Sequence, residues 1–189
     1  GFLLLYFQVN LLSACLTISA TLFYVFIYTM WLKRRTPQNI VIGGAAGAIP
    51  PLVGWAAITN EIGIPAIALF LIIFLWTPPH FWALSILLKD DYAKAKIPML
   101  PVVSSIQETA KQIVRYSVFL VSITIIFSFH SSVSYIYLGS SILLGGIFIY
   151  LSIMFKKEST ESRARKLYIF SLLYLALLFL SIILDGFFA

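Results

Sequence analysis

The sequence predicts an all-α fold, a polytopic bundle of transmembrane helices. Of its 189 residues, 61% are hydrophobic and only 11% are charged, an apolar share above that of ordinary soluble domains. Most of the apolar runs are close to the ~20 residues that cross a hydrocarbon layer ~30 Å thick. A lipid-exposed backbone must satisfy its own polar groups, and the runs are too long for barrel strands, so we expect helices.

Glycine, proline and charged residues divide the apolar runs into about six full spans and a partial one. A first helix should end near Phe7, and the full spans are expected at 10–32, 38–59, 65–88, 112–129, 135–155 and 167–186. The chain opens on Gly1-Phe2, without an initiator Met or a basic segment, as the tail of an earlier helix would. We therefore expect residues 1–189 to form a single transmembrane domain that is truncated at its N-terminus.

The charged residues test this topology. Alternating spans assign all 13 Lys and Arg residues to connections on one side, and the opposite connections carry none. The positive-inside rule predicts that these basic loops are cytoplasmic, which explains the basic balance without nucleic acid as a partner. The single cysteine, Cys15, excludes a disulfide framework and a cysteine-based metal site.

Two proline pairs fall inside consecutive spans. Pro50-Pro51 and Pro78-Pro79 each remove two amide donors, so both helices should kink or break. Such backbone is tolerated in a membrane where it lines a cavity, which predicts a shared internal chamber; packing curvature is the alternative. Gly43 and Gly47 have the spacing that lets a second helix, or a substrate, approach the backbone closely.

His80 is the only histidine inside a predicted span. An unpaired imidazole is costly in a membrane, so His80 should face a cavity or a partner group. It follows a proline pair and lies between Trp76 and Trp82. A functional pocket and a structural histidine bonded to a neighbouring helix both remain open.

The segment 89–101 is the strongest candidate for chemistry. Asp90 and Asp91 are adjacent carboxylates at a membrane boundary, and they suit Mg²⁺ held partly by water and phosphate oxygens. A modest surface ion pair between Asp90 and Lys94 is the alternative. The other acidic residues are scattered, so a second acidic cluster must lie upstream or be absent altogether. Lys33-Arg34-Arg35 and Lys94 would form a positive rim for a diphosphate, and the apolar helices beneath it imply a lipid-tailed one.

Four segments carry a resemblance to a known family. They read Trp-Leu-Lys-Arg-Arg-Thr-Pro-Gln-Asn at 31–39, Gly-Ala-Ala-Gly-Ala-Ile-Pro-Pro at 44–51, Trp-Thr-Pro-Pro-His-Phe-Trp at 76–82, and Lys-Asp-Asp-Tyr continuing to Ile-Pro-Met-Leu-Pro at 89–101. With them the chain resembles the UbiA-type intramembrane prenyltransferases over nearly its whole length, and within these the haem O synthases (protoheme IX farnesyltransferases). The second proline pair with its histidine and the Ile-Pro-Met-Leu-Pro segment separate this branch from its quinone-making relatives.

The resemblance implies a nine-helix bundle of which this chain is the C-terminal two-thirds, with a first acidic motif on an earlier helix. It implies transfer of a farnesyl group from farnesyl diphosphate to a vinyl group of haem B, which makes haem O for cytochrome oxidase. Mg²⁺ is the implied cofactor, and a haem A synthase is a candidate partner. The implied location is the bacterial plasma membrane, with the mitochondrial inner membrane as the alternative.

The resemblance also assigns roles to particular residues. Asp90, Asp91 and Tyr92 are the catalytic candidates, with both aspartates as Mg²⁺ ligands and Tyr92 in an orienting role. The substrate-binding candidates are Lys33, Arg34, Arg35, Asn39, His80 and Lys94. His80 is the expected haem contact and a candidate iron ligand, since neutral imidazole is a usual axial donor.

Two other functions compete with this one. A quinone-pathway prenyltransferase of the same fold would take an aromatic acid such as 4-hydroxybenzoate in place of haem. A transporter would also have broken helices and a polar residue near the membrane centre, but the sequence shows no inverted repeat.

Overall fold

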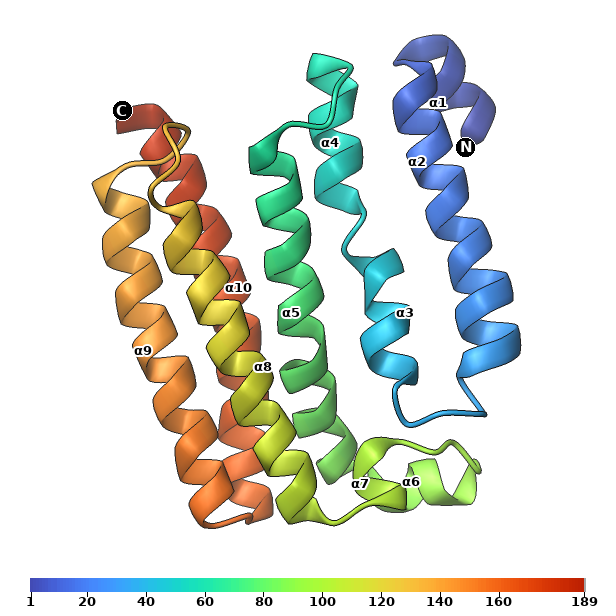
Figure 1. Ribbon diagram of the computed structural model, residues 1–189, viewed down its shortest axis with the longest axis vertical. Helices are drawn as coiled ribbons and strands as arrows, with labels where there is room; N and C mark the ends of the chain where they lie inside the picture. Colours follow the sequence, from blue (N-terminus) through green and yellow to red (C-terminus); the bar gives the residue numbers. More distant parts are fainter. Residues whose placement is uncertain (189) are drawn as a thin grey trace.

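The computed structural model describes residues 1–188, and over that range the chain is helical and contains no strand (Figure 1). The helices follow one another with short connections. In chain order they are α1 (Phe2–Gln8), α2 (Leu11–Leu22), the π-helix η1 (Phe23–Leu32), α3 (Asn39–Gly47), α4 (Pro50–Thr59), α5 (Ile64–Leu87), α6 (Lys89–Lys94), α7 (Leu100–Val103), α8 (Ile106–Phe127), α9 (Tyr135–Lys157) and α10 (Glu161–Phe188).

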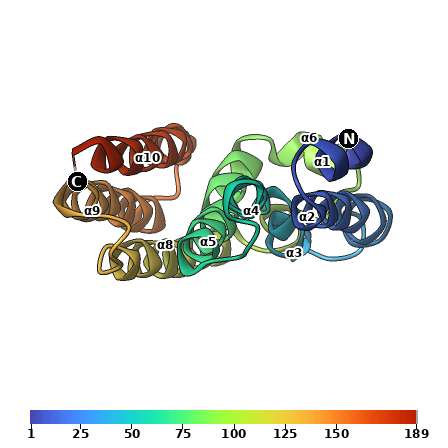
Figure 2. The ribbon, with the colours of Figure 1, turned by 90° about the horizontal axis from the view of Figure 1, so that it is seen from above.

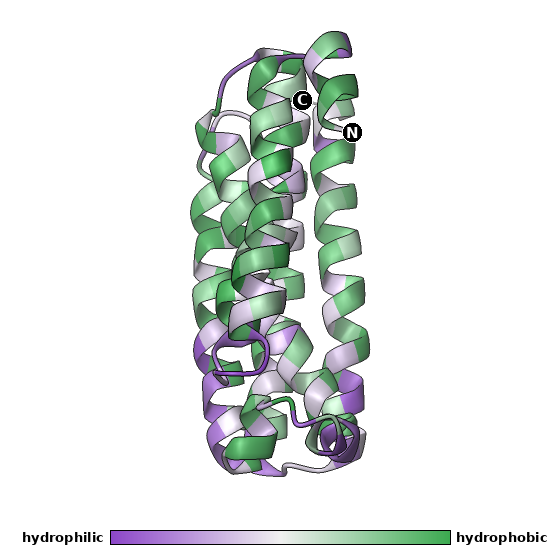
Figure 3. Ribbon diagram, turned by 90° about the vertical axis from the view of Figure 1, so that its right-hand side faces the viewer, coloured by the Kyte–Doolittle hydropathy of each residue, from purple (hydrophilic) through white to green (hydrophobic). Residues whose placement is uncertain are grey.

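Six helical segments within this range are long and apolar enough to cross a membrane, which confirms the predicted number of full spans. They are Leu11–Leu32, Asn39–Thr59, Ile64–Leu87, Ile106–Phe127, Tyr135–Lys157 and Glu161–Phe187. The protein is therefore an integral membrane protein. Figure 3 shows hydrophobic residues along the shafts of the helices and hydrophilic residues gathered at the end that carries α6.

Two predicted boundaries were wrong by about a turn and a half. The fourth span begins at Ile106, not at 112, and the sixth begins at Glu161, not at 167. In both cases the helix continues past the apolar run into charged sequence. The side chain of Ser105 caps α8 by accepting a hydrogen bond of 3.0 Å from the backbone N–H of Glu108. An N-cap binds a free amide of the first helical turn, so its position does not depend on where the apolar run begins.

The first proline pair breaks its span as predicted. Helix α3 ends at Gly47, and Pro50 and Pro51 begin α4, at positions where an α-helix needs no amide donor. The second pair does not break its span, because α5 runs continuously from Ile64 to Leu87 with Pro78 and Pro79 inside it. Thr77 directly precedes the pair, and its hydroxyl donates to the carbonyl of Ile73, one turn earlier, at 2.8 Å.

The helices form two neighbouring groups that share α5. Helices α5, α8, α9 and α10 pack on one another, and α3 and α4 join α5 to α2 and η1. Seen from above, the spans form a curved row from α10 to α2 (Figure 2). Buried hydroxyls join the first group, since Ser117 bonds to Ser152 and Thr124 bonds to Tyr174, each at 2.9 Å, as is usual between membrane helices.

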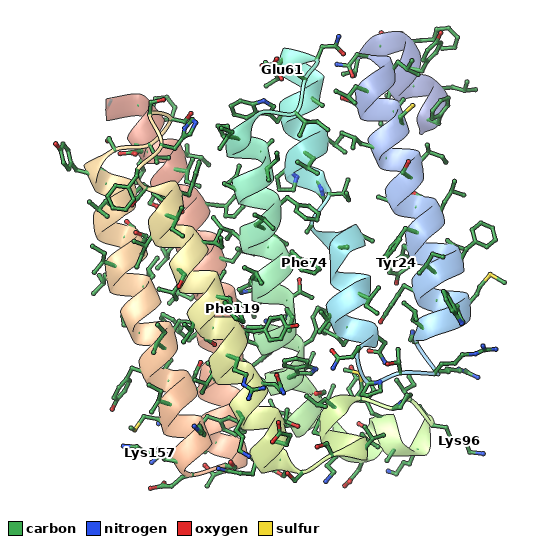
Figure 4. All side chains as sticks on the ribbon, viewed as in Figure 1. Tyr24, Glu61, Phe74, Lys96, Phe119 and Lys157 are labelled. Carbon is green, nitrogen blue, oxygen red and sulfur yellow. The ribbon has the colours of Figure 1, made fainter. Side chains whose placement is uncertain are left out.

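The connections alternate between the two ends of the bundle. Figure 4 places Lys96 and Lys157 at one end and Glu61 at the other, as the predicted alternation of spans requires. At the Glu61 end, the buried carboxylate of Asp185 on α10 accepts hydrogen bonds from the backbone N–H and the hydroxyl of Ser134, the residue that precedes α9. We refer to the end that carries the lysines as the basic end.

Candidate active site

A cavity of about 540 Å³ lies between the span formed by α2 and η1 on one side and helices α3 and α5 on the other. The two spans that contain proline pairs form only one side of it, and no proline is among its lining residues. Its lining is mostly apolar and aromatic, with a few hydroxyls. The lining residues are Ala20, Thr21, Tyr24, Tyr28, Ile40, Gly43, Gly44, Ala46, Gly47, Ile73, Trp76, Thr77 and Phe81.

Two tyrosines of η1 form one wall of the cavity. Tyr24 and Tyr28 are four residues apart, and their ring centroids are 5.3 Å apart. Figure 4 places Tyr24 in the space between η1 and α3. Both belong to a π-helix, an uncommon conformation that often occurs at functional sites. An apolar chamber with aromatic walls suits a hydrocarbon chain and excludes water.

The glycines of α3 form the opposite wall, and they have different roles. A Cβ atom added to Gly43 would lie 2.3 Å from Cδ2 of Tyr28, and one added to Gly44 would lie 3.0 Å from Cγ2 of Thr77. These two glycines therefore allow neighbouring side chains to approach the backbone closely. A Cβ at Gly47 would meet no heavy atom within 4 Å, so this glycine faces the open part of the cavity.

A basic turn connects η1 to α3 at the basic end. The side chains of Arg34 and Arg35 are exposed, and Lys33 is half-buried. Asn39 holds the turn in place, since its side-chain amide donates to the carbonyl of Lys33 at 3.1 Å. Asn39 is fully buried, and its Oδ1 has no hydrogen-bond partner among the described residues. The structure therefore places Asn39 behind the cationic turn, where it fixes the path of the backbone.

The two candidate metal ligands lie in the first turn of α6 at the same end. Asp90 and Asp91 are exposed, and neither is among the residues that line the cavity. The alternative role, an ion pair from Asp90 to Lys94, is not what the structure shows, because Lys94 Nζ lies 3.9 Å from Oδ1 of Asp91 instead. Both of these side chains are more than 70% exposed, so the pair adds little stability and leaves the carboxylates accessible.

Tyr92 lies on the same short helix as the two aspartates. Its side chain is half-buried, and it is not among the residues that line the cavity. Burial raises the pKa of Tyr92 above its usual value. The side chain therefore stays a neutral phenol at physiological pH and can donate a hydrogen bond, which suits an orienting role and does not suit a general base.

The segment after α6 anchors it to the bundle. Met99, Leu100 and Pro101 are buried, and the short helix α7 packs against α5, α6 and α8. Lys96 has a positive φ of 54°, and the backbone N–H of Ile97 returns to the carbonyl of Tyr92 at 3.0 Å. The Ile-Pro-Met-Leu-Pro sequence thus anchors the acidic helix to the spans by burying its apolar side chains against them.

His80 is buried behind the cavity wall and is not part of it. Its ring stacks on Trp76, with centroids 4.2 Å apart, and on Tyr168 of α10 at 4.9 Å. Its Nδ1 lies 2.7 Å from the hydroxyl of Ser171. That hydroxyl can donate its one proton to the carbonyl of Tyr168 at 2.6 Å, and in that arrangement Nδ1 of His80 is the donor. A neutral imidazole then carries no proton on Nε2, which leaves that nitrogen free to accept a hydrogen bond or bind a metal.

The structure thus places the predicted charged residues at the basic end of the bundle, outside the lining of the cavity, and it places His80 behind the cavity wall. It adds lining residues that sequence reasoning missed, above all Tyr24, Tyr28 and Phe81. For Tyr24 and Tyr28, the only signal in the sequence was their spacing of four residues within an apolar run. Lipid-facing tyrosines and phenylalanines have the same spacing.

The carboxylates fit the implied Mg²⁺ only in part. The described residues hold no group of three or more His, Cys, Asp or Glu side chains that would cage a metal ion. Two adjacent exposed carboxylates at the same end as a cationic turn instead fit an ion that keeps several waters and binds phosphate oxygens. Asp90 and Asp91 are therefore suited to half of such a site.

Comparisons with known proteins identify the family of this chain. The model of the UbiA prenyltransferase family matches residues 1–183. A protein named protoheme IX farnesyltransferase from Roseiflexus sp. is 48% identical over 98% of this chain and 35% of its own length. Proteins of the same name from Synechocystis sp. and Nitrosococcus oceani are 48% and 46% identical, and the chain covers 60% and 61% of them. The chain therefore spans between about a third and three fifths of these relatives.

One solved structure shares the fold. It is described as digeranylgeranylglyceryl phosphate synthase in membranes, and it superposes with a TM-score of 0.82 over 97% of this chain and 64% of its own. The sequence identity is 18%, so the likeness concerns the arrangement of helices alone.

Proposed function

Because the chain belongs to the UbiA prenyltransferase family, we propose that it provides the C-terminal part of an enzyme that transfers a farnesyl group from farnesyl diphosphate to a vinyl group of haem B. The proposal rests on the position of an apolar cavity relative to the charged residues at one end of the bundle. An apolar cavity of about 540 Å³ lies between the spans, and the exposed carboxylates of α6 and the cationic turn 33–35 lie at the basic end of the same bundle. A molecule with a diphosphate head and a prenyl tail has this polarity.

The residues at the basic end would hold the leaving group. Lys33, Arg34 and Arg35 would bind phosphate oxygens, with Lys94 as a further cation. Asp90 and Asp91 would hold Mg²⁺, which supplies positive charge where the diphosphate leaves. Tyr92, a neutral phenol on the same helix as the aspartates, would orient the diphosphate by donating a hydrogen bond.

The cavity would hold the prenyl chain during the transfer. Cleavage of the allylic C–O bond leaves an electron-poor carbon, and the apolar walls and the tyrosines of η1 would shield it from water. The vinyl carbon of haem then forms the new C–C bond, and water adds to the resulting cation with loss of a proton. The walls delay contact with water until this last step.

For the haem substrate, we propose His80 as a contact. Its Nδ1 is held by Ser171 and its ring by Trp76, which leaves Nε2 as the atom available for iron. The stacking on Trp76 also gives His80 a positioning role, because Trp76 lines the cavity.

Direct assay of the full-length protein in vesicles tests the proposal. Farnesyl diphosphate and haem B should give a product heavier than haem B by one farnesyl group and one hydroxyl group. The acceptor 4-hydroxybenzoate should give none. Prenylation of 4-hydroxybenzoate in preference to haem would assign the protein to the quinone pathway instead.

Two substitutions separate the proposed roles. Asp91→Asn should abolish Mg²⁺-dependent turnover, whereas Glu161→Gln, which removes an exposed acid at the far edge of the same end, should not; unchanged activity of the first variant would refute the metal role. His80→Ala should weaken haem binding and leave farnesyl diphosphate affinity intact. Ser171→Ala, which removes only the hydroxyl partner, should have a smaller effect, and equal losses for both substrates would point to misfolding.

The location follows from the same proposal. The basic loops should be cytoplasmic by the positive-inside rule, and the membrane should be the bacterial plasma membrane, with the mitochondrial inner membrane as the alternative. A haem A synthase remains the candidate partner.

A further inference from the structure

A second hollow with a charged rim lies at the basic end, between α9 and α10. Its volume is about 210 Å³, and it is lined by Tyr150, Leu151, Met154, Arg163 and Lys166. It shares no lining residue with the large cavity. Figure 4 shows Lys157, near the end of α9, at the opposite edge of the molecule from Lys96. We call this hollow the α9–α10 notch.

The rim of the notch carries basic residues that have no role in the proposed reaction. The segment 156–166 contains five basic and two acidic residues. The positive-inside rule accounts for the presence of these charges. It does not account for a hollow with a lysine and an arginine placed over an apolar floor.

Arg163 is held in place at this rim. Its Nη1 donates to the carbonyl of Met154 at 2.8 Å, and its Nη2 lies 2.6 Å from Oε2 of Glu158. The guanidinium keeps further N–H groups that these contacts do not use. Lys166, three residues later on the same face of α10, forms no ion pair within the described range. A fixed guanidinium next to an unengaged ammonium is suited to an anion with several oxygens.

The floor of the notch continues along a membrane-facing surface. Tyr150 lies one turn below Met154 and is 59% exposed, and Ile147 and Ile153 on the same helix are also exposed. Tyrosine at this depth is typical of the boundary between headgroups and hydrocarbon. An occupant would therefore place an anionic head between the cations and a hydrocarbon chain along α9.

We propose that the α9–α10 notch binds an anionic glycerophospholipid, with its phosphate between Arg163 and Lys166 and one acyl chain over Tyr150. Basic pockets between transmembrane helices at the cytoplasmic side are suited to such headgroups. The site is separate from the cavity that would hold the substrates, and it does not depend on the proposed reaction.

Native mass spectrometry of the purified protein tests the proposal. The protein is titrated with phosphatidylglycerol and, in parallel, with phosphatidylcholine of the same chains. Phosphatidylglycerol should be retained more strongly, and Lys166→Gln should weaken its binding about fivefold, the effect of one interfacial cation. Arg165→Gln is the matched control, because it removes the same charge from the adjacent residue on a different face of α10.

Each other outcome overturns the proposal. Equal weakening by Lys166→Gln and Arg165→Gln would show a diffuse surface charge and no site. Equal retention of both lipids would show that the notch does not recognise charge. Displacement of phosphatidylglycerol by millimolar inorganic phosphate would assign the notch to a free anion, since the acyl chain would then contribute nothing.

Discussion

Replacing Gly47 with leucine should shorten the large cavity without disturbing the protein around it. Gly47 lines the cavity on α3, and an added Cβ meets no heavy atom within 4 Å. Leucine is also favoured over glycine in a helix by about 1 kcal/mol, so the variant should fold. The new side chain would occupy space that we assign to the farnesyl chain.

The size of the effect follows from the carbons displaced. A leucine side chain contains about four carbon atoms, each worth about 0.8 kcal/mol when it is buried. If it displaces the same amount of prenyl chain, binding weakens by about 3 kcal/mol, or roughly 200-fold. Geranyl diphosphate, which is shorter by one isoprene unit, should be much less affected.

The assay compares kcat/KM for farnesyl and geranyl diphosphate in the full-length protein. Gly54→Leu is the matched control, because Gly54 lies in the same span, also has open space at its Cβ, and does not line the cavity. It should leave both donors unchanged. If Gly47→Leu reduced both donors equally, or if Gly54→Leu had the same effect, the prenyl chain would not lie against α3.

Three further predictions concern the structure around this site. Gly43→Ala should lower the free energy of unfolding by about 1–3 kcal/mol, because its Cβ would lie 2.3 Å from the ring of Tyr28; unchanged thermal stability in detergent would show that the ring moves freely. Asp185→Asn should cost about 1.5–3 kcal/mol in the same measurement, because the carboxylate accepts two hydrogen bonds from Ser134, and a loss no larger than that of an exposed acid would contradict its capping role. Burial raises the pKa of Tyr92 above its usual value of about 10, so Tyr92→Phe should lower kcat/KM without changing the shape of the pH profile between about pH 6 and pH 9. Loss of a limb of that profile would instead identify Tyr92 as a base.

The sequence predicted the spans better than it predicted their ends. Hydropathy gave all six crossing helices because burying a backbone in lipid permits few other structures. The starts of α8 and α10 were misplaced because a helix begins at a cap such as Ser105, and the position of a cap does not depend on hydropathy. The two proline pairs show the same limit, since Pro50-Pro51 begins a new helix and Pro78-Pro79 is absorbed within α5.

The candidate site was predicted unevenly. The charged residues at the basic end were recognisable because each charge in an apolar chain needs a reason to be there. The aromatic wall was not recognisable, since Tyr24 and Tyr28 differ from lipid-facing tyrosines only by what lies opposite them. The position of His80 depended on Ser171, which is 91 residues away in the sequence, and no local pattern records such a contact.

The sequence by itself determined that this protein is a membrane-embedded helical bundle, which of its loops share an end, and which side chains could bind a phosphorylated group. These properties follow from composition and order, because lipid and charge act on each segment separately. Only the tertiary structure decided that η1, α3 and α5 line a cavity and that His80 is turned towards α10. Those features arise where segments distant in the chain pack together, and packing depends on the shapes of both partners.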